Sequence, residues 1–231
     1  MRAPRYPRIP HLVRAPATAS DDGVLTDAQR QSLLRSPLVV EEKLDGANVW
    51  IQVDDVGRPH VGGRSGGASD RAGQLGRLRA WAFERAHRLA VGLKPGIVLY
   101  GEWLYLTHSL PYDRLPDYLV VVDVRRTDGT FIDRRGRESL CSELELTTTP
   151  LVYEGRLGGL DALRELHGPS AFGSAPAEGF VVRRETGGDV IERAKWVAPG
   201  FRRKTDEEWR GQRRRNELGR PRSLADGAAE G

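Results

Sequence analysis

The sequence contains very little cysteine and no long apolar segment. Its 231 residues include one cysteine, Cys141, which excludes an intramolecular disulfide and any metal site built from several cysteines. The five histidines show no close metal-ligand spacing. No apolar run approaches the length of a membrane span, and the basic, proline-rich N-terminus lacks the apolar region of a secretory signal. We therefore expect a cytoplasmic protein without a membrane partner.

Basic residues only slightly outnumber acidic ones, which favours a polyanionic partner without demanding one. The sequence has 36 lysines and arginines and 32 aspartates and glutamates, so the formal net charge is +4. Arginines crowd residues 202–222, a pattern typical both of a solvated tail and of a nucleic-acid contact surface. We predict a basic, proline-rich segment over residues 1–20, either a loose arm or a poorly packed lead-in strand, then one domain over 21–200 and a basic helical tail over 201–231.

The segment around Lys43 has the pattern of two strands joined by a tight turn. An apolar run over residues 38–40 precedes the lysine, and residues 47–53 alternate apolar and polar side chains. Gly46 would allow a positive φ angle or the close approach of a ligand. A lysine that is partly desolvated at such a turn can lose its proton and act as a nucleophile, although a lone lysine is more often a solvated surface charge.

Later segments place polar residues in predicted loops and near strand ends. A glycine-rich loop surrounds Arg64, where backbone amides and a guanidinium can converge on an anion. Glu102 follows an apolar run that predicts a buried strand. Asp123 follows Val122 in another predicted strand, over residues 117–124, where it either contributes to a site or closes a turn.

Alternation predicts which side chains share a face of each strand, because strand side chains repeat every two residues. It places Asp123 on the same face as Val121, and Glu178 on the same face as Phe180. A hairpin turn is predicted over residues 186–189. The strand after it presents two cations on one face, Arg193 and Lys195.

Helical patterns separate these strands. Thr26 has the position of an N-cap for the first helix. We predict helices over residues 26–34, 71–93, 138–146, 160–167 and 205–218.

Taken in order, the motifs resemble those of the covalent nucleotidyltransferases. Lys43-Leu44-Asp45-Gly46 is similar to the nucleotidyl-lysine motif of ATP- and NAD-dependent DNA ligases, RNA ligases and mRNA capping enzymes. The asparagine two residues after the glycine, Asn48, is similar to the residue at this position in the RNA ligase branch, in particular in the phage-type ligases that seal nicks in duplex RNA. The resemblance implies an α+β fold, the ATP-grasp-like nucleotidyltransferase or adenylation domain, with two antiparallel sheets and flanking helices.

The resemblance also implies a role for each motif residue. Lys43 would carry AMP, Lys195 and Arg193 would neutralise the α-phosphate, and Glu178 would serve a Mg²⁺ or Mn²⁺ ion. Cations beside Lys43 would depress its pKa and favour the neutral amine. Where the family places an aromatic ring that stacks on adenine, this sequence has an aliphatic residue, so an aliphatic contact or another ring replaces it. The residues implied in nucleotide binding are Glu42, Asp45, Asn48, Arg64, Glu102 and Val122.

The function implied is that of an ATP-dependent RNA ligase, which joins 5′-phosphate and 3′-hydroxyl ends through a lysyl-AMP intermediate. Two alternatives remain: a minimal ATP-dependent DNA ligase or other adenylyltransferase, and a non-catalytic nucleic-acid-binding module on the same fold. The segment after residue 197 is too short for the C-terminal domain of the ligases that the motifs resemble. We therefore expect that a partner protein helps to hold the RNA ends.

Overall fold

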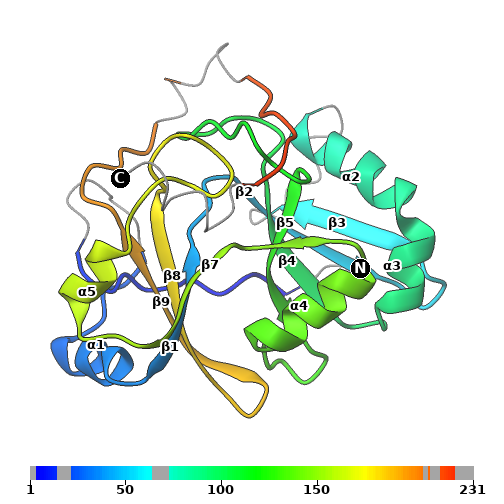
Figure 1. The fold of residues 1–231 in the computed structure, drawn as a ribbon. Helices are drawn as coiled ribbons and strands as arrows, with labels where there is room; N and C mark the ends of the chain where they lie inside the picture. Colours follow the sequence, from blue (N-terminus) through cyan, green and yellow to red (C-terminus); the bar gives the residue numbers. More distant parts are fainter. Residues whose placement is uncertain (1–3, 15–21, 64–72, 205–207, 209–213, 222–231) are drawn as a thin grey trace.

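Two β-sheets form the framework of the molecule (Figure 1). The computed structural model describes residues 4–14, 22–63, 73–204, 208 and 214–221. The four-stranded sheet is antiparallel throughout, in the order β7 (Leu151–Arg156), β1 (Pro37–Glu42), β8 (Gly179–Thr186), β9 (Asp189–Val197). In the five-stranded sheet the β5–β6 pair is parallel and the other pairs are antiparallel, in the order β3 (Pro59–Gly63), β2 (Ala47–Val53), β4 (Val98–Trp103), β5 (Leu119–Arg125), β6 (Thr147–Thr148). The predicted fold class is confirmed.

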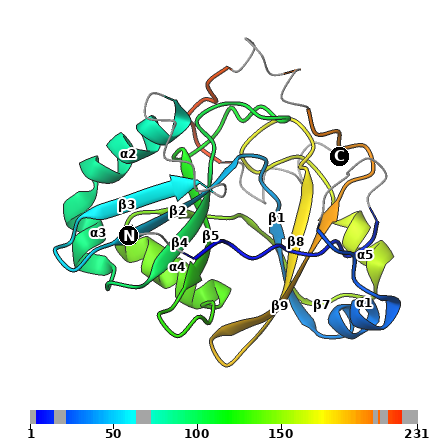
Figure 2. The same cartoon turned by 180° about the vertical axis from the view of Figure 1, so that it is seen from behind.

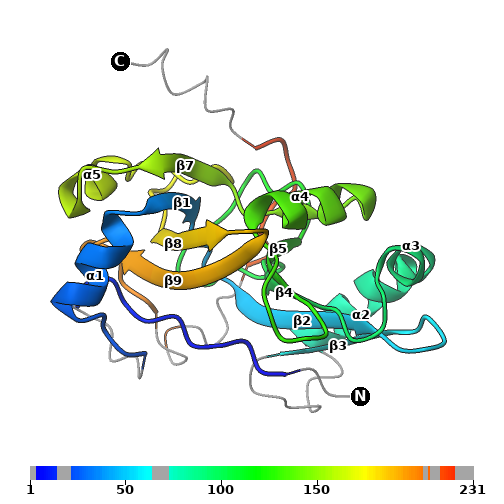
Figure 3. The same ribbon diagram turned by 90° about the horizontal axis from the view of Figure 1, so that it is seen from below.

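Helices pack on each sheet and complete two hydrophobic cores (Figure 3). Residues of α2 (Gln74–Glu84), α3 (Ala86–Gly92) and α4 (Arg134–Glu143) join the core of the five-stranded sheet, which contains the buried Trp81 and Cys141. Residues of α1 (Asp27–Leu34) and α5 (Leu160–Glu165) join the core of the four-stranded sheet. No helix in the described ranges combines the length and apolarity needed to cross a membrane.

Local contacts decide where the first helices begin and end. α1 follows Thr26, whose side chain accepts a hydrogen bond from Gln29 N–H, as the sequence predicts. The helix predicted over residues 71–93 is confirmed as helical from Gln74 to Gly92 but is not continuous, because the chain leaves helical geometry at Arg85 (φ −106°, ψ 11°) and continues as a second helix. The Arg85 guanidinium binds Asp117 at 3.1 Å, a tertiary contact at the break that the helical pattern does not reveal.

α4 begins earlier than predicted, because Asp133 supplies an N-cap. Its carboxylate accepts a hydrogen bond from Gly136 N–H at 2.9 Å and starts the helix at Arg134. The predicted helix over residues 205–218 is wrong at its C-terminal end, where Arg215 and Leu218 form β-bridges to other segments. Its remaining residues lie mostly outside the described ranges.

The N-terminal arm packs closely on the domain where it is described. The arm is defined here as residues 4–14; the rest of the predicted segment 1–20 lies outside the described ranges. Leu12 is fully buried, its N–H donates to the Lys195 carbonyl at 2.7 Å, and Lys195 N–H donates to the Pro10 carbonyl at 2.9 Å. The prediction of a loose arm is therefore wrong for these residues.

The turn that carries Lys43 joins the two sheets instead of closing a hairpin. β1 lies between β7 and β8 in one sheet, whereas β2 lies between β3 and β4 in the other. Gly46 has no positive φ angle, but a Cβ atom at this position would lie 2.5 Å from Leu104 Cδ2. Glycine lets the chain pass close to its neighbours here, and the crossing places Lys43 between the sheets.

A β-bulge at Val122 overturns the alternation predicted for β5. Tyr100 on β4 pairs with Asp123 and Gly101 pairs with Val121, so Val122 is the extra residue. Val121 stays in the core beneath the helices, whereas Asp123 bonds to Arg183 of the other sheet. Asp123 and Val121 therefore do not share a face, because the extra residue shifts the alternation by one.

The predicted alternation that places Glu178 and Phe180 on one face is also wrong, because of Gly179. Phe180 and Val182 pack in the core of the four-stranded sheet, whereas Glu178 bonds to Lys43 between the sheets. Gly179 has φ +151°, and a Cβ atom there would overlap the backbone carbonyl oxygen of Trp196. The glycine turns the chain at the start of β8, so Glu178 points away from the face that Phe180 occupies.

Substituting Gly179 by alanine is expected to destabilise the protein by about 3 kcal/mol or more, because backbone strain adds to a clash with a backbone atom. Gly187 is the matched control. It also has a positive φ angle (+60°), but a Cβ atom there meets nothing within 4 Å, so Gly187→Ala is expected to cost about 1 kcal/mol. Urea unfolding measures both values. Equal costs for the two variants would contradict the assigned role of Gly179.

Candidate active site

Lys43 lies between the sheets with its amine against a carboxylate. Its Nζ is 2.7 Å from Oε2 of Glu178, and its backbone N–H donates to the carbonyl of Gly179 at 2.9 Å. Glu102 and Lys195 line the same cavities as Lys43. The structure therefore brings together four residues predicted from distant parts of the sequence.

Two adjoining cavities meet at Lys43. We call the first the arm-side cavity; its lining includes Tyr6, Ile9, Val122 and Val181. We call the second the outer cleft; its lining includes Gln74, His108, Glu178 and Arg203. The residues shared by both include Lys43, Leu44, Asn48, Glu102 and Lys195.

The electrostatic environment of Lys43 is the reverse of the predicted one. Burial by itself would lower the pKa of Lys43, but the carboxylates of Glu178 and Glu102 outweigh this effect and raise the pKa above its ordinary value. Lys43 is therefore an ammonium ion in this structure. The predicted net depression by neighbouring cations therefore does not occur; Arg193 is bound to Asp123, and Lys195 to a carboxylate described below.

Glu102 presents an unused acceptor to the site. It pairs with Asn48 across β4 and β2, and the Asn48 side-chain amide is 3.5 Å from its Oε1. Burial raises the pKa of Glu102 to about 7. Its Oε2 is buried and accepts no hydrogen bond within the described part of the chain. A buried acceptor of this kind is matched by a ligand hydroxyl or a cation.

The two predicted phosphate-binding cations differ in position. Lys195 lines both cavities, and its ammonium group binds the carboxylate of Asp22. Burial lowers the pKa of Lys195, and Asp22 opposes the shift. Arg193 shares the strand face with Lys195, but its guanidinium binds Asp123 at 2.5 Å and lies 4.0 Å from the centre of the Phe131 ring. Arg193 is not among the residues that line either cavity.

Two acids of the lysine motif bind loop residues. Glu42 accepts hydrogen bonds from the Ser170 hydroxyl at 2.5 Å and from Ala171 N–H at 2.9 Å. Asp45 accepts hydrogen bonds from Leu110 N–H, at 3.0 Å, and from Ser109 N–H. Both acids also line a cavity, Glu42 the arm-side cavity and Asp45 the outer cleft. In this structure their carboxylates hold the loops around Lys43.

The remaining predicted residues are Val122 and Arg64. Val122 lines the arm-side cavity, where its bulged position brings it next to the site. Arg64 lies outside the described residues.

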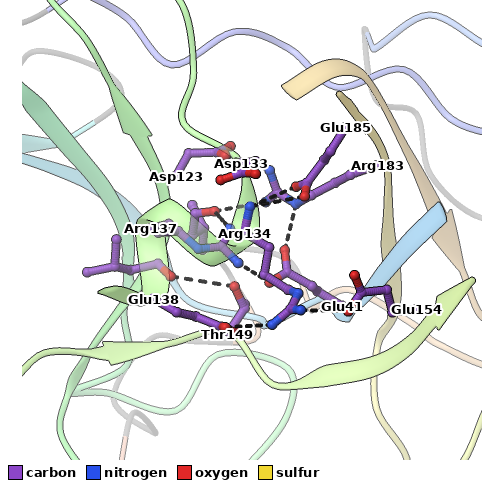
Figure 4. Close-up of polar contacts among 12 residues, drawn as sticks. Glu41, Asp123, Asp133, Arg134, Arg137, Glu138, Thr149, Glu154, Arg183 and Glu185 are labelled. Atoms are coloured by element: carbon purple, nitrogen blue, oxygen red, sulfur yellow. Dashed lines mark hydrogen bonds and ion pairs between the residues drawn. The ribbon is translucent and has the colours of Figure 1, made fainter. Parts of the chain in front are cut away.

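A buried ion network connects the two sheets beside the site, and its members Glu41 and Arg183 line the arm-side cavity (Figure 4). Arg183 of β8 binds Glu41 of β1 at 2.6 Å and Asp123 of β5 at 2.5 Å. Arg137 of α4 binds the second oxygen of Glu41. Burial would raise the pKa of Asp123, but Arg183 and Arg193 outweigh it and hold the pKa below its ordinary value. The network therefore keeps Asp123 ionised within the protein.

The same network fixes the bulge of β5. The carbonyl oxygen of Val122 accepts hydrogen bonds from Arg137 and, at 2.8 Å, from Arg183. The residues Glu41, Arg137 and Arg183 support the site but were not predicted from the sequence. The available signal was a charge within a predicted buried strand, because Glu41 directly follows the apolar run 38–40 and Arg183 follows two valines.

No group of three or more histidine, cysteine or acidic side chains within the described ranges could hold a metal ion by itself. Magnesium, however, is commonly held by one or two carboxylates together with substrate phosphates. Glu178 and the unpaired oxygen of Glu102 match that donor set. The residues present therefore fit a divalent cation that binds together with a nucleotide.

The site and the fold are matched by a known family. The sequence model of the RNA ligase family covers residues 36–197 of the chain. The chain belongs to the RNA ligase family. The matched region contains β1 through β9, and no curated protein sequence matches the chain.

Solved structures of an RNA ligase share the fold. Three variants of the Naegleria gruberi RNA ligase, each determined with ATP and Mn, align with TM-scores of 0.52, 0.53 and 0.54 at 17%, 14% and 16% identity. The alignments cover 73%, 86% and 84% of this chain, but 51%, 61% and 60% of the ligase chains. This chain therefore spans about half to three fifths of the length of the ligase chains in these structures.

Proposed function

We propose that the protein is an ATP-dependent RNA ligase that carries AMP on Lys43. The observation that supports this most is the position of Lys43 Nζ, 2.7 Å from Glu178 and between two cavities that Glu102 and Lys195 also line. These are the groups that a nucleotidyl transfer needs: a nucleophilic amine, a cation for the phosphates and buried acceptors. Membership in the RNA ligase family supports the same conclusion.

The first step is attack of the Lys43 amine on the α-phosphorus of ATP. Lys43 first loses one ammonium proton to solvent. A nitrogen–phosphorus bond then forms, the bond from the α-phosphorus to the bridging oxygen of the β-phosphate breaks, pyrophosphate leaves, and the nitrogen gives a second proton to solvent. Catalysis of such a transfer is mainly positioning and charge neutralisation. The contact with Glu178 fixes the direction of Nζ, and Lys195 would exchange Asp22 for the phosphate oxygens.

The acids beside Lys43 would hold a divalent cation together with the nucleotide. Glu178 would hold it, with the unpaired oxygen of Glu102 available to the cation or to the ribose hydroxyls. When bound, the cation would supply charge neutralisation at the phosphates. These acids raise the pKa of Lys43. If Glu178 bound the cation instead of Lys43, the pKa of Lys43 would fall and the neutral amine would be favoured.

The later steps transfer AMP to RNA. A 5′-phosphate oxygen displaces Lys43 from the AMP phosphorus, and a 3′-hydroxyl then attacks the activated 5′-phosphate and releases AMP. We assign this chemistry to a domain over residues 21–200, with residues 201–231 as a basic tail that contacts RNA. We also propose a protein partner that holds the two RNA ends.

Nick sealing tests the proposed substrate. With ATP and magnesium, the full chain is expected to seal a nick with 5′-phosphate and 3′-hydroxyl ends in duplex RNA at least about tenfold faster than the same nick in DNA. A site built to bind a substrate hydroxyl rejects an analogue that lacks it. Gel separation of end-labelled strands measures both rates, and a nick without the 5′-phosphate is the control. Faster sealing of DNA would identify a DNA ligase instead.

A further inference from the structure

The arm bridges the two sheets on one side of the site (Figure 2). At one end, the Tyr100 hydroxyl of β4 donates to the Pro4 carbonyl at 2.6 Å. At the other end, residues 10–12 exchange backbone hydrogen bonds with Lys195 of β9. Residues 6–9 therefore pass from the five-stranded sheet to the four-stranded sheet, held at both ends.

The side chains of this bridging segment enter the site. Tyr6, Pro7 and Ile9 line the arm-side cavity together with Lys43 and Glu102. Tyr6 is held firmly, because its ring centre lies 4.9 Å from that of Tyr100 and its hydroxyl donates to Asp123. The arm is thus part of the cavity wall, although it lies outside the matched region 36–197.

The two cavities suit different parts of a nucleotide. The outer cleft carries the charged groups Glu178 and Arg203, which suits phosphates and their cation. Both linings mix charged and apolar groups: the outer cleft also includes Leu75, Trp103 and Phe201, and the arm-side cavity also includes Glu41 and Arg183. What distinguishes the arm-side cavity is an aromatic ring and aliphatic side chains from the arm and both sheets, namely Tyr6, Ile9, Val122 and Val181. Apolar walls of this kind bind a flat heterocycle by removing its faces from water.

We propose that residues 6–9 form one wall of the adenine pocket, with Val122 and Val181 forming another. This inference rests on the proposed function, because AMP attached to Lys43 is what directs the base into the cavity beside it. The nucleotide site of this chain then includes a segment outside its RNA ligase region, and the arm contributes to the choice and affinity of the base.

Truncating Ile9 tests the inference in the full chain. Ile9→Ala is expected to weaken ATP binding about tenfold, because it removes apolar contact with the base. The affinity for inorganic tripolyphosphate, which has no base, is expected to stay unchanged. The control is Val13→Ala, since Val13 lies on the same arm and packs against the core of the four-stranded sheet instead of the cavity; it should leave both affinities unchanged. Calorimetric titration gives all the dissociation constants.

A second variant tests the same wall by enlarging the side chain instead of truncating it. Ile9→Trp fills the cavity and is expected to abolish ATP binding while tripolyphosphate still binds. If Ile9→Ala and Ile9→Trp change both ligands equally, or change neither, the arm does not contact the base and the inference is overturned.

The outcomes separate this inference from the proposed function. If the wild type takes up labelled AMP and Ile9→Ala binds ATP like Val13→Ala, the arm inference fails alone. If the wild type binds ATP but takes up no AMP, the ligase proposal fails, and a base-dependent loss in Ile9→Ala would still place the arm at the base.

Discussion

Replacing Lys43 by alanine is expected to abolish covalent attachment of AMP to the protein. The amine of Lys43 is the nucleophile in the proposed reaction, and its removal leaves nothing for the phosphorus to bond to. The measurement is the label retained on the denatured chain after incubation with α-labelled ATP and magnesium. The wild type should retain label, and Lys43→Ala should retain none above background.

Two further variants make the Lys43 result specific. Lys43→Arg keeps a cation beside Glu178 but lacks a nucleophilic amine, so it should fold normally and retain no label. Lys94→Ala removes an exposed lysine and should label like the wild type. Treating the wild type first with pyrophosphate removes any AMP already bound. Label on Lys43→Arg, or a folded and treated wild type without label, would contradict the proposal; the latter result would favour a non-catalytic binding module.

Replacing Arg183 by methionine is expected to destabilise the protein by about 3–5 kcal/mol. Arg183 is 1% exposed and binds two fully buried acids, Glu41 and Asp123. Methionine keeps much of the volume but leaves these carboxylates with less compensating charge, and breaking a buried ion pair has a cost of this size. The free energy of unfolding in urea measures the effect.

The adjacent residue provides the control for Arg183. Arg184 binds Glu192 at 3.1 Å with its side chain 36% exposed, so Arg184→Met should cost only about 0–1 kcal/mol. Adding Asp123→Asn to Arg183→Met should recover part of the lost stability, because it removes one uncompensated charge. If Arg183→Met costs no more than Arg184→Met, the network does not stabilise the fold in the way proposed.

Several elements follow from short-range patterns in the sequence. Residues 47–53 form β2 as their alternation predicts, and Thr26 caps α1 through contacts with its own helix. The turn after Thr186 contains Gly187 and Gly188, both with positive φ angles, as a two-residue hairpin requires. These features depend on neighbours in the chain, so the sequence alone determines them.

The order of the motifs along the chain also indicates the protein family. The Lys43 motif, Glu102, Glu178 and the cations of β9 predict a nucleotidyltransferase fold without any knowledge of the contacts between them. Their assigned chemical roles stay predictions until the labelling and nick-sealing experiments are done. The order of motifs is informative because several weak patterns in one fixed sequence rarely coincide by chance.

Only the tertiary structure decided how the site is built. The bulge at Val122 depends on two guanidinium groups from other elements, and Gly179 turns Glu178 toward Lys43 where β8 passes close to β9. The charge on Lys43 depends on acids that are distant in the chain. Alternation and composition describe a residue's near neighbours, whereas these features arise from contacts across the sheets. That is the physical reason why the sequence alone determined the strands, caps and turns, and the structure determined the electrostatics and walls of the site.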